Sequence, residues 1–339
     1  MGLLRFLLAM LVMLSHTGLT AGGLNPGVVA VVVFYAISGY VMSALIGKHF
    51  SHTGQAVHFY IDRLARIYPQ YLFYAVAAGV WFFWVGQTTP FLQHPPSWHE
   101  LLNNVLIVPL NFFMFNAADQ FTLVPPAWSL GAEVLFYVLA PWLWRHWRVA
   151  VLFGAGSLVV QALAWHNVLP TDAWGYRLLP GVLWIFIAGM ALQRYQQGHA
   201  QLARHAMWLA PVLSFVVALL LDLQSELISP YNREVLLGFA LALPALVFLT
   251  QYSPTQGHWH VWDKRFGDWS YGIFLNHFFC MWVLGLSAPQ STMQWAFLCL
   301  ASIGLSALTQ HYLERPIIIW RQKRRQAWQL AHKALKIHT

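Results

Sequence analysis

Apolar residues along this chain occur in long runs separated by short polar connections. A helix needs about 20 mostly apolar residues to cross the hydrocarbon core of a bilayer. Ten runs approach that length, so the pattern predicts an all-α polytopic membrane protein with about ten transmembrane helices. The runs cover residues 3–20, 27–47, 69–86, 128–144, 149–166, 177–194, 206–222, 235–252, 269–287 and 293–313. A further apolar stretch, 101–115, is short and contains three asparagines and one proline, which predicts a re-entrant or interfacial segment.

The distribution of basic residues predicts the direction of these helices. With the N-terminus in the cytoplasm and the helices alternating, all but two of the 19 lysines and arginines fall in cytoplasmic connections or in the tail. Arg204 is among them, and only Arg177 and Arg233 lie outside. Because cytoplasmic loops carry an excess of positive charge, we expect both termini in the cytoplasm. The chain then forms one transmembrane domain, residues 1–314, and a basic cytoplasmic C-terminal tail, residues 315–339.

Composition supports the same class and excludes others. Hydrophobic residues make up 58% of the chain and charged residues only 9%, against about a quarter charged in a typical soluble domain. So much apolar sequence also excludes intrinsic disorder. The formal net charge of +8 reflects membrane topology rather than a nucleic-acid-binding face, because the basic residues lie in short connections. The two cysteines lie inside predicted helices and are interpreted as core residues.

Ionisable residues inside membrane helices are costly and usually face a protein interior or a wet cavity. Arg5 and His16 both belong to the first apolar run. Eleven residues separate them, which brings them within about 20° of the same helix face and roughly 16 Å apart along the axis. We interpret them as one polar stripe, with Arg5 at the cytoplasmic edge and His16 in the outer half. Each also has a simpler explanation, a snorkelling anchor for Arg5 and a packing histidine for His16.

Glu133 is a second ionisable residue at membrane depth, in the run from Trp128 to Tyr137. Because this helix enters from the outer side, Glu133 is predicted at a depth similar to that of His16, where the two side chains could touch. Tyr137 follows at i+4 on the same helix face. Alternatively, Glu133 only complements the positive N-terminal end of its helix.

Arg63 and Arg66 lie three residues apart in a predicted cytoplasmic connection. On a helical turn their guanidinium groups would share one face and offer bidentate hydrogen bonds to a phosphate or another anion. Ordinary positive-inside topology combined with lipid headgroup binding would also explain them.

Three further positions carry polar groups in apolar runs. Ser38-Gly39-Tyr40 lies inside the second helix, where glycine permits a kink or close helix packing. His277, near the middle of the ninth helix, is either functional or a buried hydrogen-bonded residue. Glu314 and Arg315 predict an ion pair within the tenth helix, and Pro316 predicts the end of that helix.

Motifs for metal or nucleotide chemistry are missing from the sequence. No histidine, cysteine or carboxylate spacing fits a metal site, and neither GxGxxG nor a P-loop occurs. We therefore predict no metal ligands and no bound cofactor.

Five short motifs, in their order along the chain, resemble the membrane-bound acyltransferase 3 family, whose members include bacterial O-acetyltransferases of surface polysaccharides. The motifs are Arg5 with His16, Phe34-Tyr35-Ala36-Ile37-Ser38-Gly39-Tyr40, Arg63-Leu64-Ala65-Arg66-Ile67-Tyr68-Pro69, Trp128 to Tyr137, and Gly267 to His277. The resemblance covers nearly the whole chain. Asp62 departs from it, because the family more often has a basic residue there, and this departure suggests less positive charge at the donor site.

The resemblance implies a membrane-bound O-acyltransferase of the bacterial cytoplasmic (inner) membrane. Such an enzyme moves an acyl group, usually acetyl from acetyl-CoA, to a hydroxyl of a cell-surface polysaccharide or glycolipid. Acyl-CoA is then a co-substrate, and polysaccharide-synthesis proteins are expected partners. In this hypothesis the cytoplasmic donor site contains Arg5, Arg63, Arg66, Ser38 and Tyr40. His16 is the general base or forms an acyl intermediate, Glu133 assists it, and the site is lined by Tyr137, Trp128 and His277.

Two other functional classes stay open. His16, Glu133 and His277 could form a proton relay in a multispan transporter or flippase, although no internal repeat supports that architecture. The third class is a non-catalytic membrane scaffold that binds lipid or a partner.

Overall fold

The computed structural model describes residues 1–198, 205, 207–252 and 256–337, so Arg204 and the first residue of the run 206–222 lie outside the described part. Within that part the chain is helical and contains no named strand. A helix coincides with each of the ten predicted runs. These helices are α1 (Gly2–Ser15), α2 (Pro26–His49), α3 (Ala56–Val85), α6 (Ala127–Arg145), α7 (Trp147–Trp165), α8 (Leu179–Gly198), α10 (Leu209–Leu223), α11 (Asn232–Tyr252), α12 (Gly257–Leu284) and α13 (Thr292–Thr309).

Length and hydropathy make five of the described helical segments candidate membrane spans. They are Pro26–His49, Trp147–Trp165, Thr171–Gly198, Asn232–Gln251 and Thr292–Trp328. Two shorter apolar helices, α1 and α10, accompany them. The chain is therefore an all-helical protein with several candidate spans, while the count of ten spans and the cytoplasmic termini stay predictions.

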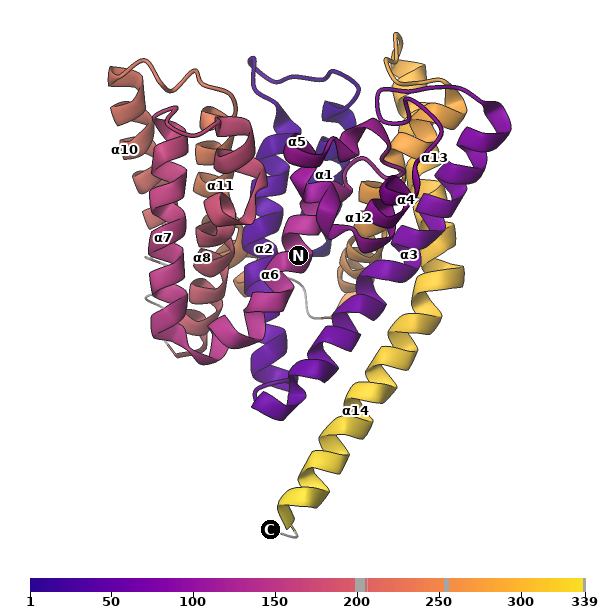
Figure 1. Cartoon of the computed structure of the whole chain (residues 1–339). Coiled ribbons are helices and arrows are strands. Elements are labelled where there is room, and N and C mark those ends of the chain that lie inside the picture. Colours follow the sequence, from indigo (N-terminus) through magenta and orange to yellow (C-terminus); the bar gives the residue numbers. More distant parts are fainter. Residues whose placement is uncertain (199–204, 206, 253–255, 338–339) are drawn as a thin grey trace.

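Helix α2 runs through the middle of the bundle and packs against α1, α6, α8 and α11 (Figure 1). Asn25 caps its start by accepting a hydrogen bond from the Gly27 N–H at 2.9 Å, and Pro26 suits the first helical position. A Cβ atom on Gly39 would come within 1.9 Å of the Phe186 carbonyl oxygen in α8. Gly39 therefore permits close packing of α2 on α8, the simpler of its two interpretations.

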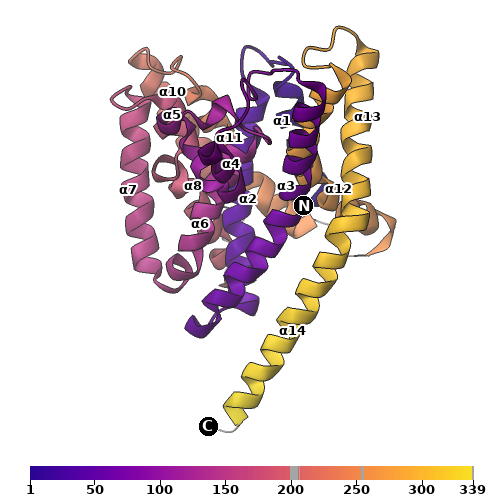
Figure 2. The same cartoon turned by 45° about the vertical axis from the view of Figure 1, so that its right-hand side comes forward.

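The other helices form two groups on either side of this centre (Figures 1 and 2). Helices α7, α8, α10 and α11 lie on one side, and α3, α12 and α13 lie on the other. Helix α1 packs along α12, whose Asp263 carboxylate accepts hydrogen bonds from the N–H groups of Gly2 at 3.1 Å and Leu3 at 2.9 Å. This carboxylate satisfies two donors at the positive end of α1 and fixes the height of α1 in the bundle.

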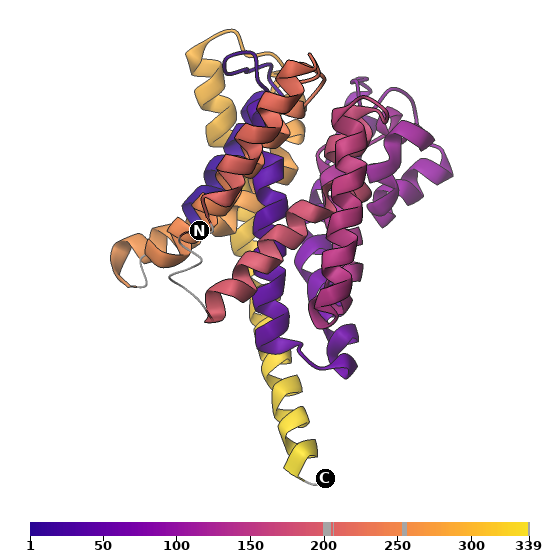
Figure 3. The same cartoon turned by 90° about the vertical axis from the view of Figure 1, so that its left-hand side faces the viewer.

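Helix α14 (Arg315–Ile337) continues the chain beyond α13 and extends out of the bundle in every view (Figure 3). Pro316 does not end the helical run, so that prediction was wrong. The chain passes through one wider π turn, η5 (Gln310–Glu314), and Pro316 then lies in the first turn of α14, where its missing N–H is tolerated. We call the end of the bundle from which α14 extends the tail face, and the other end the opposite face.

The stretch around residues 101–115 folds as short helical pieces near the opposite face (Figure 1). They are α4 (Trp98–Leu106), η2 (Val108–Phe112), α5 (Phe113–Asn116) and η3 (Ala118–Gln120). The buried Asn104 side chain donates to the carbonyls of Glu100 and Phe121, each at 2.9 Å. The buried Asn111 side chain donates to two more carbonyls. Asparagine thus satisfies backbone groups that the broken helix leaves unpaired.

Candidate active site

Two adjoining cavities lie in the bundle between α1, α2, α6 and α12. The first, which we call the Arg cavity, is also lined by α3 and has a volume of about 170 Å³, and its polar lining consists of Arg5, Tyr35, Ser38, Arg63, Arg66, Ser129, Glu133, Tyr137, Ser270 and Tyr271. The second, the His cavity, has a volume of about 310 Å³, and its ionisable lining consists of His16, Asp119, Tyr176, Arg177 and Tyr231. Val31, Ser129 and Phe274 line both. The two cavities therefore share walls and form neighbouring compartments of one site.

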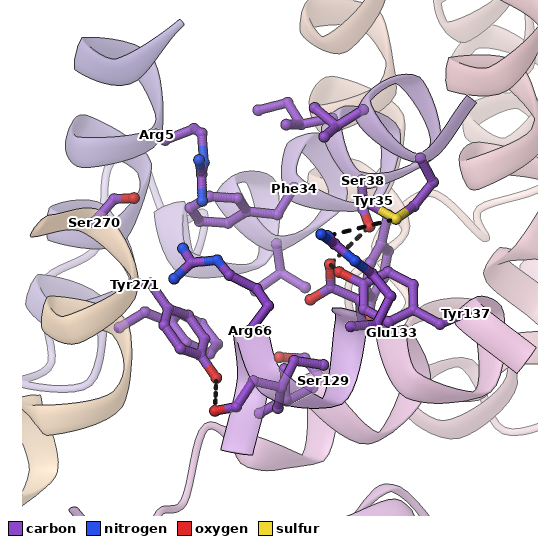
Figure 4. Close-up of a pocket in the computed structure, with 18 residues that line it drawn as sticks. Arg5, Phe34, Tyr35, Ser38, Arg66, Ser129, Glu133, Tyr137, Ser270 and Tyr271 are labelled. Carbon is purple, nitrogen blue, oxygen red and sulfur yellow. Dashed lines mark hydrogen bonds between the residues drawn. The ribbon is translucent and has the colours of Figure 1, made fainter. Parts of the chain in front are cut away.

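The Arg cavity brings together Arg5 from α1 with Arg63 and Arg66 from α3 (Figure 4). Arg5, Arg66 and Tyr271 lie on one side of it, and Ser38, Glu133 and Tyr137 lie on the other. Two helices thus bring three guanidinium groups to one small space, although Arg5 and Arg63 are more than 50 positions apart in the sequence. Buried cations in such number need anionic partners.

Glu133 is one of these anionic partners. Its Oε1 accepts hydrogen bonds from the Ser38 hydroxyl at 2.7 Å and from the Tyr137 hydroxyl at 2.5 Å. His16 lines the other cavity and makes its side-chain hydrogen bond with a different residue. The predicted contact between His16 and Glu133 is therefore absent from the described structure, and Glu133 belongs with the arginines.

Arg66 is held by two groups. Its guanidinium forms an ion pair with Glu314 from η5 and lies 4.8 Å from the centre of the Tyr271 ring. The predicted pair of Glu314 with Arg315 was wrong, because the π turn directs Glu314 into the bundle, where it is buried, while Arg315 is exposed. The turn that joins α13 to α14 therefore helps to position an arginine of the Arg cavity.

Asp62 is the centre of a buried ion cluster beside the Arg cavity. Its carboxylate accepts two hydrogen bonds from each of Arg63, Arg321 and Arg325, at 2.5–3.2 Å. Burial alone would raise the pKa of the Asp62 carboxyl, but Arg325, Arg63 and Arg321 outweigh that effect and hold this pKa well below its usual range. The expectation that Asp62 reduces the local positive charge does not hold for the cluster, because α14 adds two arginines.

His16, which lines the His cavity, contacts His277, a buried residue that lines neither cavity, contrary to the prediction that it lines the site. His277 Nδ1 lies 3.1 Å from the Ile273 carbonyl oxygen, and His277 Nε2 lies 3.1 Å from His16 Nδ1. A carbonyl only accepts, so His277 carries its proton on Nδ1 and its neutral Nε2 accepts from His16. Neutral His16 then carries its proton on Nδ1 and has an unprotonated Nε2. This hydrogen-bond chain leaves His16 in the tautomer of a general base.

Arg177 is a residue of this site that the sequence analysis did not select. It ends η4 (Thr171–Arg177), and its guanidinium lies 4.5 Å from the centre of the Trp128 ring. Its Nε donates a hydrogen bond to the Asp172 carboxylate at 2.7 Å. Its two terminal nitrogens donate a hydrogen bond to none of the described residues. Tyr231 packs against it with a backbone φ of 67°, which is uncommon for a tyrosine. The aromatic residues Trp174 and Tyr176, which closely precede Arg177 in the sequence, were the available signal.

The remaining predicted residues divide between the two cavities and the helix packing. Trp128 lines the His cavity, while Ser38 and Tyr137 line the Arg cavity. Tyr40 lies outside both, and its hydroxyl donates to the Gln196 side chain at 2.6 Å. Of the predicted donor residues, four therefore meet in one cavity and Tyr40 does not.

Comparison with known proteins identifies the family of this chain. The acyltransferase domain of the acyltransferase 3 family matches residues 1–311. The chain belongs to this family. It is therefore an acyltransferase, and both cavities lie within the matched part.

Two relatives give further context for this acyltransferase. It is 32% identical over 191 residues to an uncharacterized protein of Aquifex aeolicus (strain VF5), an alignment that covers 55% of this chain and 85% of that protein. It is 26% identical over 283 residues to acyltransferase MdmB of Streptomyces mycarofaciens, covering 74% of this chain and 67% of that protein. No solved structure matches the chain significantly.

Proposed function

We propose that this acyltransferase transfers an acyl group, most simply acetyl, from acyl-CoA to a hydroxyl of a surface polysaccharide or glycolipid. The donor would occupy the Arg cavity with its phosphates toward the tail face, and the acceptor would occupy the His cavity. The enzyme would act in the bacterial cytoplasmic membrane, together with proteins of polysaccharide synthesis. The observation that carries the proposal is the hydrogen-bond chain from the Ile273 carbonyl through His277 to His16 Nδ1, which would leave Nε2 of a neutral His16 unprotonated in a cavity next to three arginines.

His16 has the role of general base in this reaction. A sugar hydroxyl is a weak nucleophile at neutral pH, and a neutral imidazole that takes its proton accelerates attack by roughly 10²–10⁴. As the hydroxyl oxygen bonds to the thioester carbonyl carbon, its proton moves to His16 Nε2. The C–S bond then breaks, and the CoA thiolate leaves and takes up that proton. His277 keeps His16 in the required tautomer, as the third member of a catalytic triad does.

The Arg cavity has the role of holding the donor. Guanidinium groups suit phosphates because each can donate two parallel hydrogen bonds. Glu133 would balance the charge of the arginines and fix the Ser38 and Tyr137 hydroxyls rather than assist His16 directly. The shared residues Val31, Ser129 and Phe274 mark the boundary that the acyl end of the donor must reach.

The His cavity has the composition expected for an acceptor with hydroxyl groups. Arg177 offers donors, the Asp119 carboxylate offers acceptors, and Trp128 offers an aromatic face for the apolar side of a sugar ring. No hydrogen bond or ion pair to another described residue engages the Asp119 side chain. These groups face the same cavity as His16, so an acceptor hydroxyl bound there would lie within its reach.

Label transfer tests the reaction. Membranes that contain the protein should move radiolabel from acetyl-CoA to envelope glycan, and membranes without it should not. An equal transfer in both, or label that stays on CoA, would contradict the proposal.

Cysteine labelling tests the orientation. With Cys280 and Cys299 replaced by alanine, Ser51→Cys near the tail face should resist an impermeant thiol reagent in intact cells, and Gln224→Cys should react. The reverse pattern would place the donor site on the wrong side for cytoplasmic acyl-CoA.

A further inference from the structure

Helix α14 contributes more than a basic tail, because Arg321 is buried and Arg325 is part-buried against α3. The side chains of Arg321 and Arg325 are 8% and 18% exposed, and that of Asp62 is 1% exposed. Arginine is seldom buried unless it is paired. Both residues lie beyond residue 311, where the match to the family ends, so the family motifs do not account for them.

The charge in this cluster is unbalanced. Arg63, Arg321 and Arg325 carry three positive charges, and Asp62 carries the single negative charge that all three share. Two positive charges remain without an acidic partner in the cluster. Burying excess charge of one sign is costly, so the cluster is suited to an additional anion.

The cluster adjoins the Arg cavity on its tail side. Arg63 belongs to both, since it lines the cavity and binds Asp62. Arg66 lies one helical turn deeper along α3 and is paired with Glu314, which directly precedes α14. The start and the first three turns of α14 are thereby connected to two arginines of the cavity.

We propose that Arg321 and Arg325 of α14 complete the donor site and bind the phosphates of acyl-CoA together with Arg63. This inference rests on the proposed function, in which the acyl arm lies in the Arg cavity. The phosphates of an extended donor then reach from Arg63 and Arg66, on the tail side of the cavity, into the cluster, where the excess positive charge is found. Asp62 holds the three guanidinium groups in place before the donor arrives.

The test compares two donors in membranes normalised for the amount of protein. Acetyl-CoA carries phosphates, and acetyl-pantetheine carries the same thioester arm without them. Arg325→Ala should raise the KM for acetyl-CoA about ten-fold, the effect of one lost charge-assisted hydrogen bond, and leave the KM for acetyl-pantetheine unchanged. Lys323→Ala, the loss of one exposed charge from the same helix, should change neither. If Arg325→Ala affects both donors equally, or reduces only turnover or protein amount, α14 has a structural role and the inference is wrong.

A binding measurement separates this inference from the proposed reaction. Even if no transfer occurs, wild-type protein should bind CoA more tightly than pantetheine, which lacks the phosphates, and Arg321→Ala should remove most of that difference. Without CoA, Asp62→Asn should have a lower thermal stability than wild type, because three cations then lack their anion. Added CoA should raise the thermal stability of Asp62→Asn by more than it raises that of wild type. A protein that binds CoA and pantetheine equally, with an Asp62→Asn variant that CoA does not stabilise, would overturn the inference.

Discussion

The Arg cavity and the His cavity share walls but differ in how their polar groups are used. In the Arg cavity the ionisable groups are mostly engaged, Arg66 with Glu314, Arg63 with Asp62, and Glu133 with two hydroxyls. In the larger His cavity, His16 Nε2 and the ends of Arg177 have no partner among the described residues. Engaged charges give a fixed electrostatic field, whereas free polar atoms can bind and react. Under the proposed function, this difference would place donor binding in the first cavity and chemistry in the second.

The largest expected effect comes from removing the base. His16→Ala should reduce acyl transfer by about 10²–10⁴ while the protein is still inserted and expressed, because the His16 side chain lines a cavity at the end of α1, where alanine can adopt the same helical backbone conformation. Initial rates in membranes normalised for protein amount measure this. Activity within a few-fold of wild type would remove His16 as the base.

Disturbing the Arg cavity should affect the donor instead. Because Arg66→Ala alone would leave Glu314 buried without its cation, the informative variant is Arg66→Ala/Glu314→Gln. Its donor KM should rise by about ten- to a hundred-fold, the loss of one charged hydrogen bond to phosphate. Lysine at position 66 should recover part of this, because a point charge cannot form the bidentate contact. Normal donor kinetics with reduced insertion would leave Arg66 as a topological anchor.

A substitution at His277 should lower turnover but leave donor binding unchanged, because His277 contacts the proposed base and not the donor site. His277→Phe removes the acceptor for His16 Nδ1–H and should reduce turnover by about ten-fold, the usual range for one buried hydrogen bond left unmade. His277→Gln provides an acceptor again and should recover part of the activity. The donor KM should stay constant in both, and a rise in it would show that the two cavities are not separate in function.

The smallest effect is expected at Asp119. Asp119→Asn keeps the size of the side chain but weakens its hydrogen bonds to acceptor hydroxyls, so the acceptor KM should rise about three- to ten-fold. Turnover at saturating acceptor should be nearly unchanged. Asp172→Asn is the matched control, since Asp172 pairs with Arg177 but does not line the cavity. Equal effects of the two variants would indicate a general influence on Arg177 rather than acceptor binding.

Much of this arrangement could be predicted from hydropathy and motifs, because the position and the faces of a helix depend on residues that are close together in the sequence. Apolar runs fix where helices form, and the eleven-residue spacing of Arg5 and His16 places both on one face of α1, where each now lines one of the two cavities. The broken stretch around Asn104 and Asn111 was also predicted, because polar residues interrupt its apolar run.

The features that could not be predicted are contacts between side chains of different helices, because the sequence does not show which helices pack together. His16 and His277 are 261 residues apart, and nothing in either helix alone indicates that α1 and α12 pack together. Depth along the membrane favoured Glu133 as the partner of His16, but rotation of α6 directs Glu133 toward Ser38. Arg177 was assigned to an outer connection by charge alone, since its cage of aromatic rings forms only from four separate segments.

The division of roles between the cavities is tested most directly by equilibrium binding of radiolabelled acetyl-CoA to purified wild-type, His16→Ala and Arg66→Lys proteins. The two-cavity account predicts that His16→Ala binds the donor within about two-fold of wild type although it transfers nothing, and that Arg66→Lys binds it about ten-fold more weakly. Loss of donor binding in His16→Ala with normal binding in Arg66→Lys would contradict it.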